Sequence, residues 1–261
     1  MEKTIQFIDT HIHIDAEEFD VDREETVERA RKAGMTAMLV PAIDEASLQK
    51  VMDVCQHYPG FAFPMTGLHP EEVRNDYQEV LERMGKLLPG PFVAIGEVGL
   101  DYYWSREYEK EQCLAFDIQV QWACEMKMPL MIHCRKAQNE MVAIMKNYKN
   151  SLAGGVFHCF TGNLKEAEQL LDFEGFALGI GGVLTFKKSH LPEVIAHVPL
   201  SRIVLETDAP YMAPVPMRGK RNESAFIPYI IDRMAQCYGV EPQVVADATT
   251  ANTHRIFNRM G

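Results

Sequence analysis

Histidines and carboxylates occur in this chain directly after short apolar runs. The first run is followed by Asp9-Thr-His11-Ile-His13, and residues two apart on an extended chain point the same way, so two imidazoles can face one ion. An H-x-H pair alone is weak evidence, because ordinary histidines also occur at strand ends. The pattern therefore raises metal binding as the chemistry to test at the other strand ends.

Other apolar runs also end in a side chain that can bind a cation. Any single one could be a helix N-cap or a satisfied core histidine, but five of the eight predicted strand ends carry such a residue. Imidazole and carboxylate donors without a thiolate are typical of Zn²⁺, Mn²⁺, Fe²⁺ or Mg²⁺ sites and disfavour a cysteine-rich structural zinc site. The candidate donors are His11, His13, Glu97, His133, His158 and Asp208, with Glu206 two residues before Asp208.

Eight short runs would have to position these side chains. The runs are continuously apolar rather than alternating, which is typical of parallel strands covered on both faces. Apolar stripes with helical spacing lie between them, for example at residues 48–55 and 114–126. The predicted strands are residues 4–9, 36–40, 61–65, 92–95, 130–132, 155–157, 176–180 and 203–205.

Strands that alternate with helices in a chain of 261 residues favour a single (β/α)₈ TIM barrel, which typically takes about 250 residues. A doubly wound open sheet is the alternative. No linker or charge block divides the sequence, so we predict one domain over residues 1–261. Gly34 and Gly239 mark predicted helix ends, and residues 241–258 are expected to close one end of the barrel. The metal site is expected at the C-terminal ends of the strands.

Composition excludes several classes of protein. The chain is 47% hydrophobic and 24% charged, as ordinary globular proteins are, and it contains no run of about 20 apolar residues that would predict a membrane span. The absence of a signal-peptide pattern and six cysteines without C-x-x-C spacing favour a reduced, cytoplasmic protein. The net charge of −11 argues against a broad nucleic-acid-binding face, although not against a small one.

The segments around these strand ends resemble those of the TatD family of metal-dependent deoxyribonucleases, which are binuclear amidohydrolase-like barrels. The resemblance runs from Asp9 to Asn252, with departures at Cys134, Lys136 and Ser224 that leave substrate preference open. The matching segments are Asp9-Thr-His-Ile-His-Ile-Asp15, Thr66-Gly-Leu-His-Pro70, Gly96-Glu-Val-Gly-Leu-Asp-Tyr-Tyr103, Ile132-His-Cys-Arg135, His158-Cys-Phe-Thr-Gly162, Glu206-Thr-Asp-Ala-Pro-Tyr211 and Arg218-Gly-Lys-Arg-Asn-Glu223.

This resemblance implies a hydrolase that cleaves phosphodiester bonds of DNA, at ends or in single strands, through a metal-activated water. It implies two divalent ions, Mg²⁺, Mn²⁺ or Zn²⁺, and a catalytic role for Asp208 as the acceptor of the water's proton. By position, His11, His13, Glu97 and Asp208 would hold one ion, and Glu97, His133 and His158 the other, with Glu97 as the bridge.

Residues near the C-terminal ends of the predicted strands are also expected to bind the substrate, which is DNA or an oligonucleotide. No obligate protein partner is predicted. His69 is assigned a catalytic role at the phosphate or leaving group, with orientation of a metal ligand as the alternative. Arg135 would bind a phosphate, and Tyr103, with Tyr102 and Trp104, would stack on an unpaired base. Arg218, Lys220 and Arg221 form a basic cluster in the loop after the last strand.

Two other functions remain open from the sequence. The same barrel and metals could hydrolyse a small amide, a lactone or an aminoacyl ester, because fold alone does not choose the chemistry. A metal-binding module without catalysis is the third hypothesis. The remaining histidines are left out of the site, and activity should fall below about pH 6 because ligating imidazoles must be neutral. These histidines are His57, His190, His197 and His254.

Overall fold

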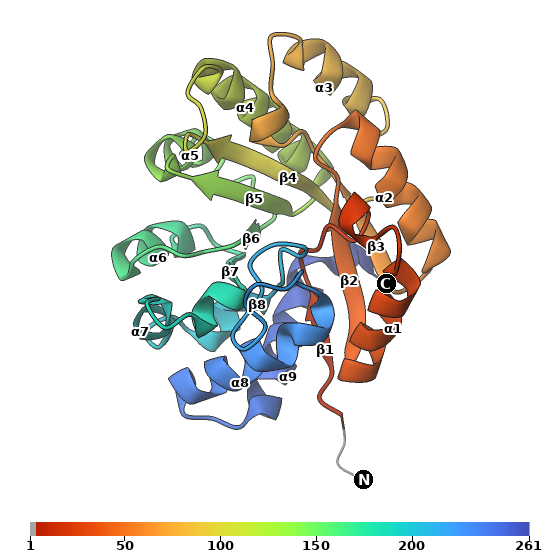
Figure 1. Cartoon of the computed structure of the whole chain (residues 1–261). Helices are drawn as coiled ribbons and strands as arrows, with labels where there is room; N and C mark the ends of the chain where they lie inside the picture. Colours follow the sequence, from red (N-terminus) through yellow and green to blue (C-terminus); the bar gives the residue numbers. More distant parts are fainter. Residues whose placement is uncertain (1–3, 261) are drawn as a thin grey trace.

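A single parallel sheet organises the molecule. The computed structural model describes residues 4–260, so both tips of the predicted domain, residues 1–3 and 261, lie outside the described part. Figure 1 shows helices on the outside of the strands. The sheet runs in order from β1 to β8, with the bounds β1 (Phe7–Asp9), β2 (Met35–Pro41), β3 (Ala62–Thr66), β4 (Ala94–Asp101), β5 (Leu130–Arg135), β6 (Gly155–Phe157), β7 (Phe176–Ile180) and β8 (Ile203–Leu205).

The first and last strands meet and close the barrel. The Thr10 backbone N–H donates to the carbonyl of Leu205 at 3.0 Å, and Ile12 pairs with Ala209 just beyond the two strands. The predicted (β/α)₈ barrel is therefore confirmed, and the open doubly wound sheet is wrong.

The helices follow the strands as the apolar spacing predicts. The helices that precede Gly34 and Gly239 end at the residue before each glycine, as expected. The bounds are α1 (Arg23–Ala33), α2 (Glu45–His57), α3 (Tyr77–Gly85), α4 (Glu109–Met126), α5 (Gln138–Lys146), α6 (Leu164–Leu171), α7 (Leu191–Ile195), α8 (Ile227–Tyr238) and α9 (Pro242–Ile256).

The core has two layers. Inward-facing side chains such as Leu39, Met131 and Val204 fill the barrel, and Ile256 and Phe257 at the end of α9 pack against the same cluster. Between the sheet and the helices lies a second, larger apolar layer. The predicted closing helix is thus confirmed, and each fully buried aliphatic or aromatic side chain contributes about 1.5–3 kcal/mol to folding.

Strands β4 and β5 extend beyond the predicted ends at residues 95 and 132, reaching Asp101 and Arg135. The register places Ile95 opposite Leu130 but Val98 opposite Ile132, so β4 carries one extra residue, a β-bulge. Gly99 permits the extension, because its φ is 146° and a Cβ there would lie 1.8 Å from the His133 carbonyl oxygen. Glu97 and His133 therefore lie within paired strands rather than in loops.

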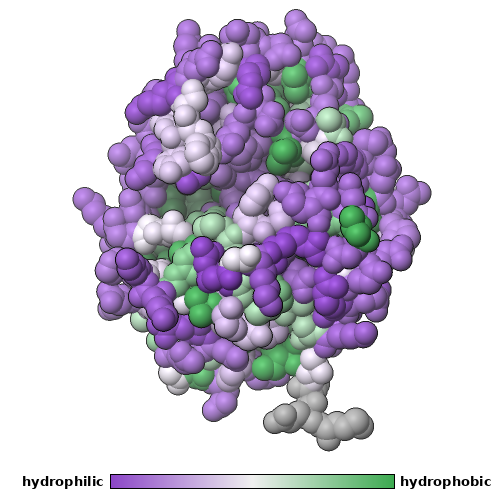
Figure 2. Space-filling model, in the orientation of Figure 1, coloured by the Kyte–Doolittle hydropathy of each residue, from purple (hydrophilic) through white to green (hydrophobic). Residues whose placement is uncertain are grey.

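The outer surface is mostly hydrophilic in the view of Figure 2, as the charged composition predicts. Among residues 4–260 no helix is long and apolar enough to cross a membrane. The six cysteines are free thiols, as their spacing predicts.

Candidate metal centre

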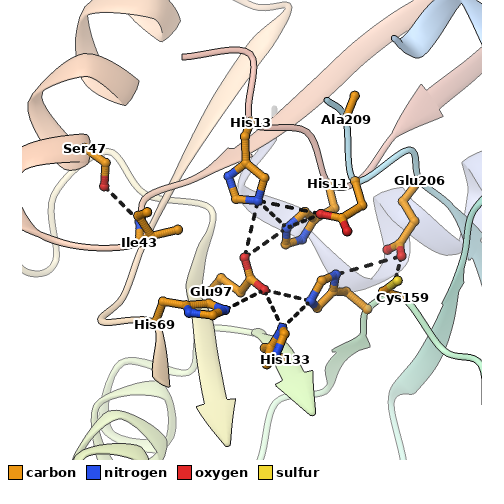
Figure 3. A network of polar contacts seen from close by, with 12 residues as sticks. His11, His13, Ile43, Ser47, His69, Glu97, His133, Cys159, Glu206 and Ala209 are labelled. Atoms are coloured by element: carbon orange, nitrogen blue, oxygen red, sulfur yellow. Dashed lines mark hydrogen bonds and ion pairs between the residues drawn. The ribbon is translucent and has the colours of Figure 1, made fainter. Parts of the chain in front are cut away.

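Glu97 occupies the centre of the barrel mouth, and each of its two carboxylate oxygens faces a different pair of imidazoles. Oε2 lies 3.1 Å from His11 Nε2 and 3.5 Å from His13 Nε2. Oε1 lies 2.7 Å from His158 Nε2 and 2.9 Å from His133 Nδ1. Figure 3 shows His11 and His13 on one side of Glu97 and His133 on the other. One carboxylate thus contacts two pairs of nitrogen donors, and the His11 and His158 rings of these pairs are stacked with their centroids 4.0 Å apart.

The first half-site consists of His11, His13, Asp208 and Glu97 Oε2. Both histidines lie in the segment after β1, which backbone hydrogen bonds tie to the segment after β8: Asp208 N–H donates to the His11 carbonyl and His13 N–H to the Ala209 carbonyl, both at 2.9 Å. Asp208 Oδ1 lies 3.9 Å from His11 Nε2 and 3.7 Å from His13 Nε2. Closure of the barrel therefore assembles this half-site.

The second half-site consists of His133, His158 and Glu97 Oε1. His133 Nε2, on the far side of the ring from Glu97, lies 2.8 Å from Asp101 Oδ2. Behind His158, the buried carboxylate of Glu206 lies 3.9 Å from Nδ1 and accepts a hydrogen bond from the Cys159 backbone N–H. Both imidazoles thus have a buried carboxylate on the side away from Glu97.

His69 lies beside the second half-site, with Nε2 3.3 Å from Glu97 Oε1. Its Nδ1 accepts a hydrogen bond from the Glu71 backbone N–H at 3.1 Å. In the neutral ring the proton must therefore be on Nε2, the atom that faces the mouth. In this tautomer His69 offers a hydrogen-bond donor to the mouth, not a lone pair for a cation.

Burial lowers the pKa of each of the four half-site histidines, and neighbouring carboxylates raise it. Burial dominates in the first half-site and the carboxylates dominate in the second. In the first half-site burial lowers the pKa of His11 to about 3 and that of His13 to about 4, so both rings are neutral at pH 7. In the second, burial opposes the charge on His133, but hydrogen bonds to Asp101 and Glu97 outweigh it and raise its pKa to about 10.

The two carboxylates between the imidazoles also differ. Burial favours the neutral form of Glu97, yet the imidazoles around it hold its pKa well below its usual range. Burial raises the pKa of Asp208 to about 6. At pH 7 both carboxylates are therefore ionised, and Asp208 is the more basic of the two.

The donor set fits divalent cations. Ligand atoms within 4.8 Å of one another form four groups: His11 with His13 and Glu97, His11 with His158 and Asp208, His69 with Glu97 and His133, and Glu71 with Asp101 and His133. His11 Nε2 and His13 Nε2 are 3.3 Å apart, and His133 Nδ1 and His158 Nε2 are 3.1 Å apart. Facing nitrogen lone pairs repel unless a proton or a cation lies between them, so both pairs suit a bound ion.

Asp9, which the sequence analysis left out of the site, supports the first half-site from behind. This fully buried carboxylate accepts hydrogen bonds from the Thr207 hydroxyl at 2.6 Å, the Ser224 hydroxyl at 2.7 Å and the His11 backbone N–H at 3.2 Å. Ser224, one of the departures from the family pattern, therefore has a defined partner. The network links the start of the segment that carries His11 and His13 to the loop after β8.

An exposed aromatic pair lies at the rim, in the loop after β4. Tyr103 and Trp104 are 49% and 68% exposed, and the Arg135 guanidinium lies 3.5 Å from the centre of the Tyr103 ring. Tyr102 is different, because it is buried and its hydroxyl contacts Cys113 Sγ at 3.2 Å. The expectation that Tyr102 stacks on a base is therefore wrong.

The side chains of the predicted basic cluster do not gather into one group that is available to a phosphate. Arg221 turns toward the start of α1 and makes a two-pronged ion pair with Asp22, at 2.7 and 2.8 Å. Arg218 donates to the Ala213 carbonyl in its own loop, while Lys220 is exposed. Arg221 thus fastens the loop after β8 to α1, and its assignment to the substrate is corrected.

The four histidines left out of the site lie away from the mouth, on or beside α2, α7 and α9.

Comparison with known proteins assigns the family. A family model described as TatD related DNase matches residues 8–258. The chain is 35% identical over 251 residues to the uncharacterized metal-dependent hydrolase YabD of Bacillus subtilis (strain 168), covering 95% of this chain and 98% of the relative. It is 34% identical over 256 residues to the 3'-5' ssDNA/RNA exonuclease TatD of Pantoea vagans (strain C9-1), covering 95% and 98%.

Solved structures agree with this assignment. The crystal structure of YJJV, a TatD homologue from Escherichia coli K12, superposes with a TM-score of 0.88 at 29% identity and covers 98% of this chain and 99% of that one. An N-acetyl-D-glucosamine-6-phosphate deacetylase from Mycobacterium smegmatis, at 12% identity and a TM-score of 0.61, shares the fold alone. The chain therefore belongs to the TatD-related DNase family.

Proposed function

We propose that this protein is a metal-dependent nuclease that removes nucleotides from the end of a single strand of DNA by hydrolysing phosphodiester bonds. The observation that carries the proposal is the division of Glu97 between two groups of imidazoles, 2.7–3.5 Å from its two oxygens. Membership of a DNase family and a relative named as a 3'-5' ssDNA/RNA exonuclease support this substrate class.

In this proposal the chain holds two divalent ions. The first half-site would hold one and the second half-site the other, with Glu97 between them. When bound, such ions stabilise the charge that develops on a phosphodiester and lower the pKa of a water molecule. Four imidazole donors suit Zn²⁺, whereas Mn²⁺ and Mg²⁺ prefer oxygen ligands, which Glu97 and Asp208 supply.

The chain's own residues then share the proton transfers. Asp208 is ionised at pH 7, because its pKa is about 6, and its carboxylate can take a proton from the attacking water. His69 presents its Nε2 proton to the mouth and would donate a hydrogen bond to a phosphate or leaving oxygen. No nucleophilic serine or cysteine is needed, because positioning and charge stabilisation supply most of the acceleration.

Substrate selection would depend on the rim. Tyr103 and Trp104 are exposed beside the mouth and can stack on an unpaired base, and Arg135 and Lys220 offer positive charge for phosphates. Arg218 would contact the substrate only if a phosphate reaches its position in the loop after β8. The net charge of −11 disfavours a long duplex track, so a strand end is the proposed substrate.

We propose that residues 1–261 form one catalytic barrel that works without an obligate protein partner. Six free thiols support a reducing compartment, and we assign the protein to the cytoplasm on that basis.

The direct test uses a single-stranded oligonucleotide labelled at its 5' end. Shortening from the 3' end should require Mn²⁺ or Zn²⁺, stop with a chelator, and fall by about 10²–10⁴-fold in Asp208→Asn. Glu166→Gln, which changes a carboxylate in the cap of α6, is the matched control and should retain activity. Hydrolysis of amide, lactone or aminoacyl ester substrates without any cleavage of DNA would overturn the proposal in favour of the second enzymatic function.

A further inference from the structure

Asp101 is a buried carboxylate that bonds to two different parts of the site. Its Oδ2 lies 2.8 Å from His133 Nε2, and its Oδ1 accepts the Tyr103 backbone N–H at 2.8 Å. His133 belongs to the second half-site, and Tyr103 begins the exposed aromatic rim. One side chain thus contacts both a candidate metal ligand and the candidate base-stacking loop.

The backbone of Asp101 is itself held in place. Gln112 of α4 accepts a hydrogen bond from the Asp101 N–H at 3.0 Å and donates one to the Asp101 carbonyl at 3.1 Å. Both residues are buried, so water does not compete with this pair of bonds. The helix therefore fixes the position from which the carboxylate reaches His133.

We propose that Asp101 is a positioning residue that holds a proton on His133 Nε2, so that Nδ1 is the ring nitrogen that gives up its proton and binds the second ion. With its other oxygen it holds the start of the Tyr103–Trp104 rim at a fixed distance from that ion. This inference rests on the proposed two-ion function. A carboxylate behind a metal-bound imidazole is a general way to fix the tautomer and orientation of the ring.

The chemistry of the two contacts requires a carboxylate. Both neighbours of Asp101 are N–H donors, and a carboxylate can accept from both at once. In Asp101→Asn, one of the two positions would be taken by an NH₂ group. If that group faced His133, Nε2 would have to accept, and the proton would move to Nδ1, the atom that faces Glu97. If it faced Tyr103, the rim would lose its bond.

The test measures ion binding rather than turnover. Calorimetric titration of Zn²⁺ into the metal-free protein should give two equivalents in the wild type, and in Asp101→Asn the second ion should bind about 10–100-fold more weakly while the first is unchanged. In ¹⁵N spectra of the Zn²⁺-loaded wild type, His133 should show a protonated Nε2 and a metal-bound Nδ1. Asp117→Asn, a half-buried carboxylate of α4 that accepts a hydrogen bond from the Tyr148 hydroxyl and not from any residue of the site, is the matched control and should bind both ions as the wild type does.

A second variant keeps the test valid if Asp101→Asn folds poorly. Gln112→Ala removes the hydrogen bonds that hold the Asp101 backbone and leaves His133 in place. It should also weaken the binding of the second ion, by a smaller factor than Asp101→Asn does. Binding of both ions to Asp101→Asn and Gln112→Ala with wild-type affinity would overturn the inference. Two ions in the wild type without DNA cleavage would instead overturn the proposed nuclease and leave the role of Asp101 in place.

Discussion

The two half-sites use the same ligand types but differ in what lies behind their imidazoles. Among the residues that the structure describes, buried His11 Nδ1 has no hydrogen-bond partner in the first half-site, and neither has His158 Nδ1 in the second. In the second, Asp101 lies 2.8 Å behind His133, and Glu206 is 3.9 Å from His158. The two pairs also differ in charge: burial keeps the first pair neutral, whereas in the second pair Asp101 and Glu97 at His133, and Glu97 followed by Glu206 at His158, outweigh burial and raise the pKa of both histidines.

This difference shows that ligand identity alone does not define a metal site. The first half-site offers free lone pairs at neutral pH, so an ion can bind without displacing a proton. The second half-site holds a proton on His133 until an ion replaces it. Two ions bound as proposed should therefore differ in how their binding depends on pH.

Replacing Glu97 should have the largest effect, because it is the one residue that both half-sites share. Glu97→Gln removes the charge between the imidazole pairs, and both ions should be lost, with kcat falling by about 10³-fold or more. Metal content after dialysis and cleavage of a labelled oligonucleotide measure the two effects. If Glu97→Gln kept two ions and wild-type kcat, the half-sites would not be joined through this carboxylate.

Activity should fall as the pH drops through about 6, for a reason that differs from the expectation based on free histidine. His11 and His13, with pKa values of about 3 and 4, stay neutral at pH 5, whereas Asp208 takes up a proton near its pKa of about 6. A proton on Asp208 removes the base and competes with the ion of the first half-site, so kcat/KM measured at subsaturating metal should decrease up to tenfold per pH unit below that value. A profile from pH 4.5 to 8.5 measures this, and a flat profile down to pH 4.5 would exclude Asp208 as the base.

Proton release should separate the two half-sites directly. At pH 7.5 the ion in the first half-site should displace no imidazole proton, while the ion in the second should release about one from His133, whose pKa is about 10. Calorimetry in buffers of different ionisation enthalpy counts these protons. The affinity of the second ion should rise with pH up to tenfold per unit, and equal proton release from both ions would remove the contrast between the half-sites.

Much of this site was predictable, because its ligands follow apolar runs and the H-x-H spacing matches the period of a strand. The barrel brought together all six candidate donors at one mouth, as the alternation of strands and helices predicts. The sequence places Glu206 beside the candidate donors, whereas Asp101 is absent from the predicted site. Asp101 was assigned to a loop because β4 was expected to end at residue 95, before its polar, glycine-containing part.

A signal for Asp101 was nevertheless present. Glu97, Gly99 and Asp101 alternate, so in a longer strand they share one face, and the glycine leaves room for the His133 backbone. Arg221 shows the opposite error. Its basic neighbours suggested phosphate binding, but its partner, Asp22, is 199 positions away in the sequence, and only tertiary structure brings them together.

The smallest effect is expected at Arg221, outside both half-sites. Because its guanidinium is paired with Asp22, Arg221→Ala should leave both ions bound and KM within about twofold, and should lower the free energy of unfolding by about 1 kcal/mol or less. Arg135→Ala is the comparison variant and should raise KM. Oligonucleotide kinetics and denaturant unfolding check both effects, and a large increase in KM for Arg221→Ala would restore it to the substrate site.

In the proposed function Glu97 joins two half-sites that each hold an ion. The most direct test of this arrangement is electron paramagnetic resonance of the protein titrated with Mn²⁺, because two Mn²⁺ ions joined by one carboxylate are magnetically coupled. We predict a coupled pair at two equivalents in the wild type, and a single isolated Mn²⁺ in both His13→Ala and His133→Ala. A wild-type protein that saturates with one uncoupled Mn²⁺ would contradict the account.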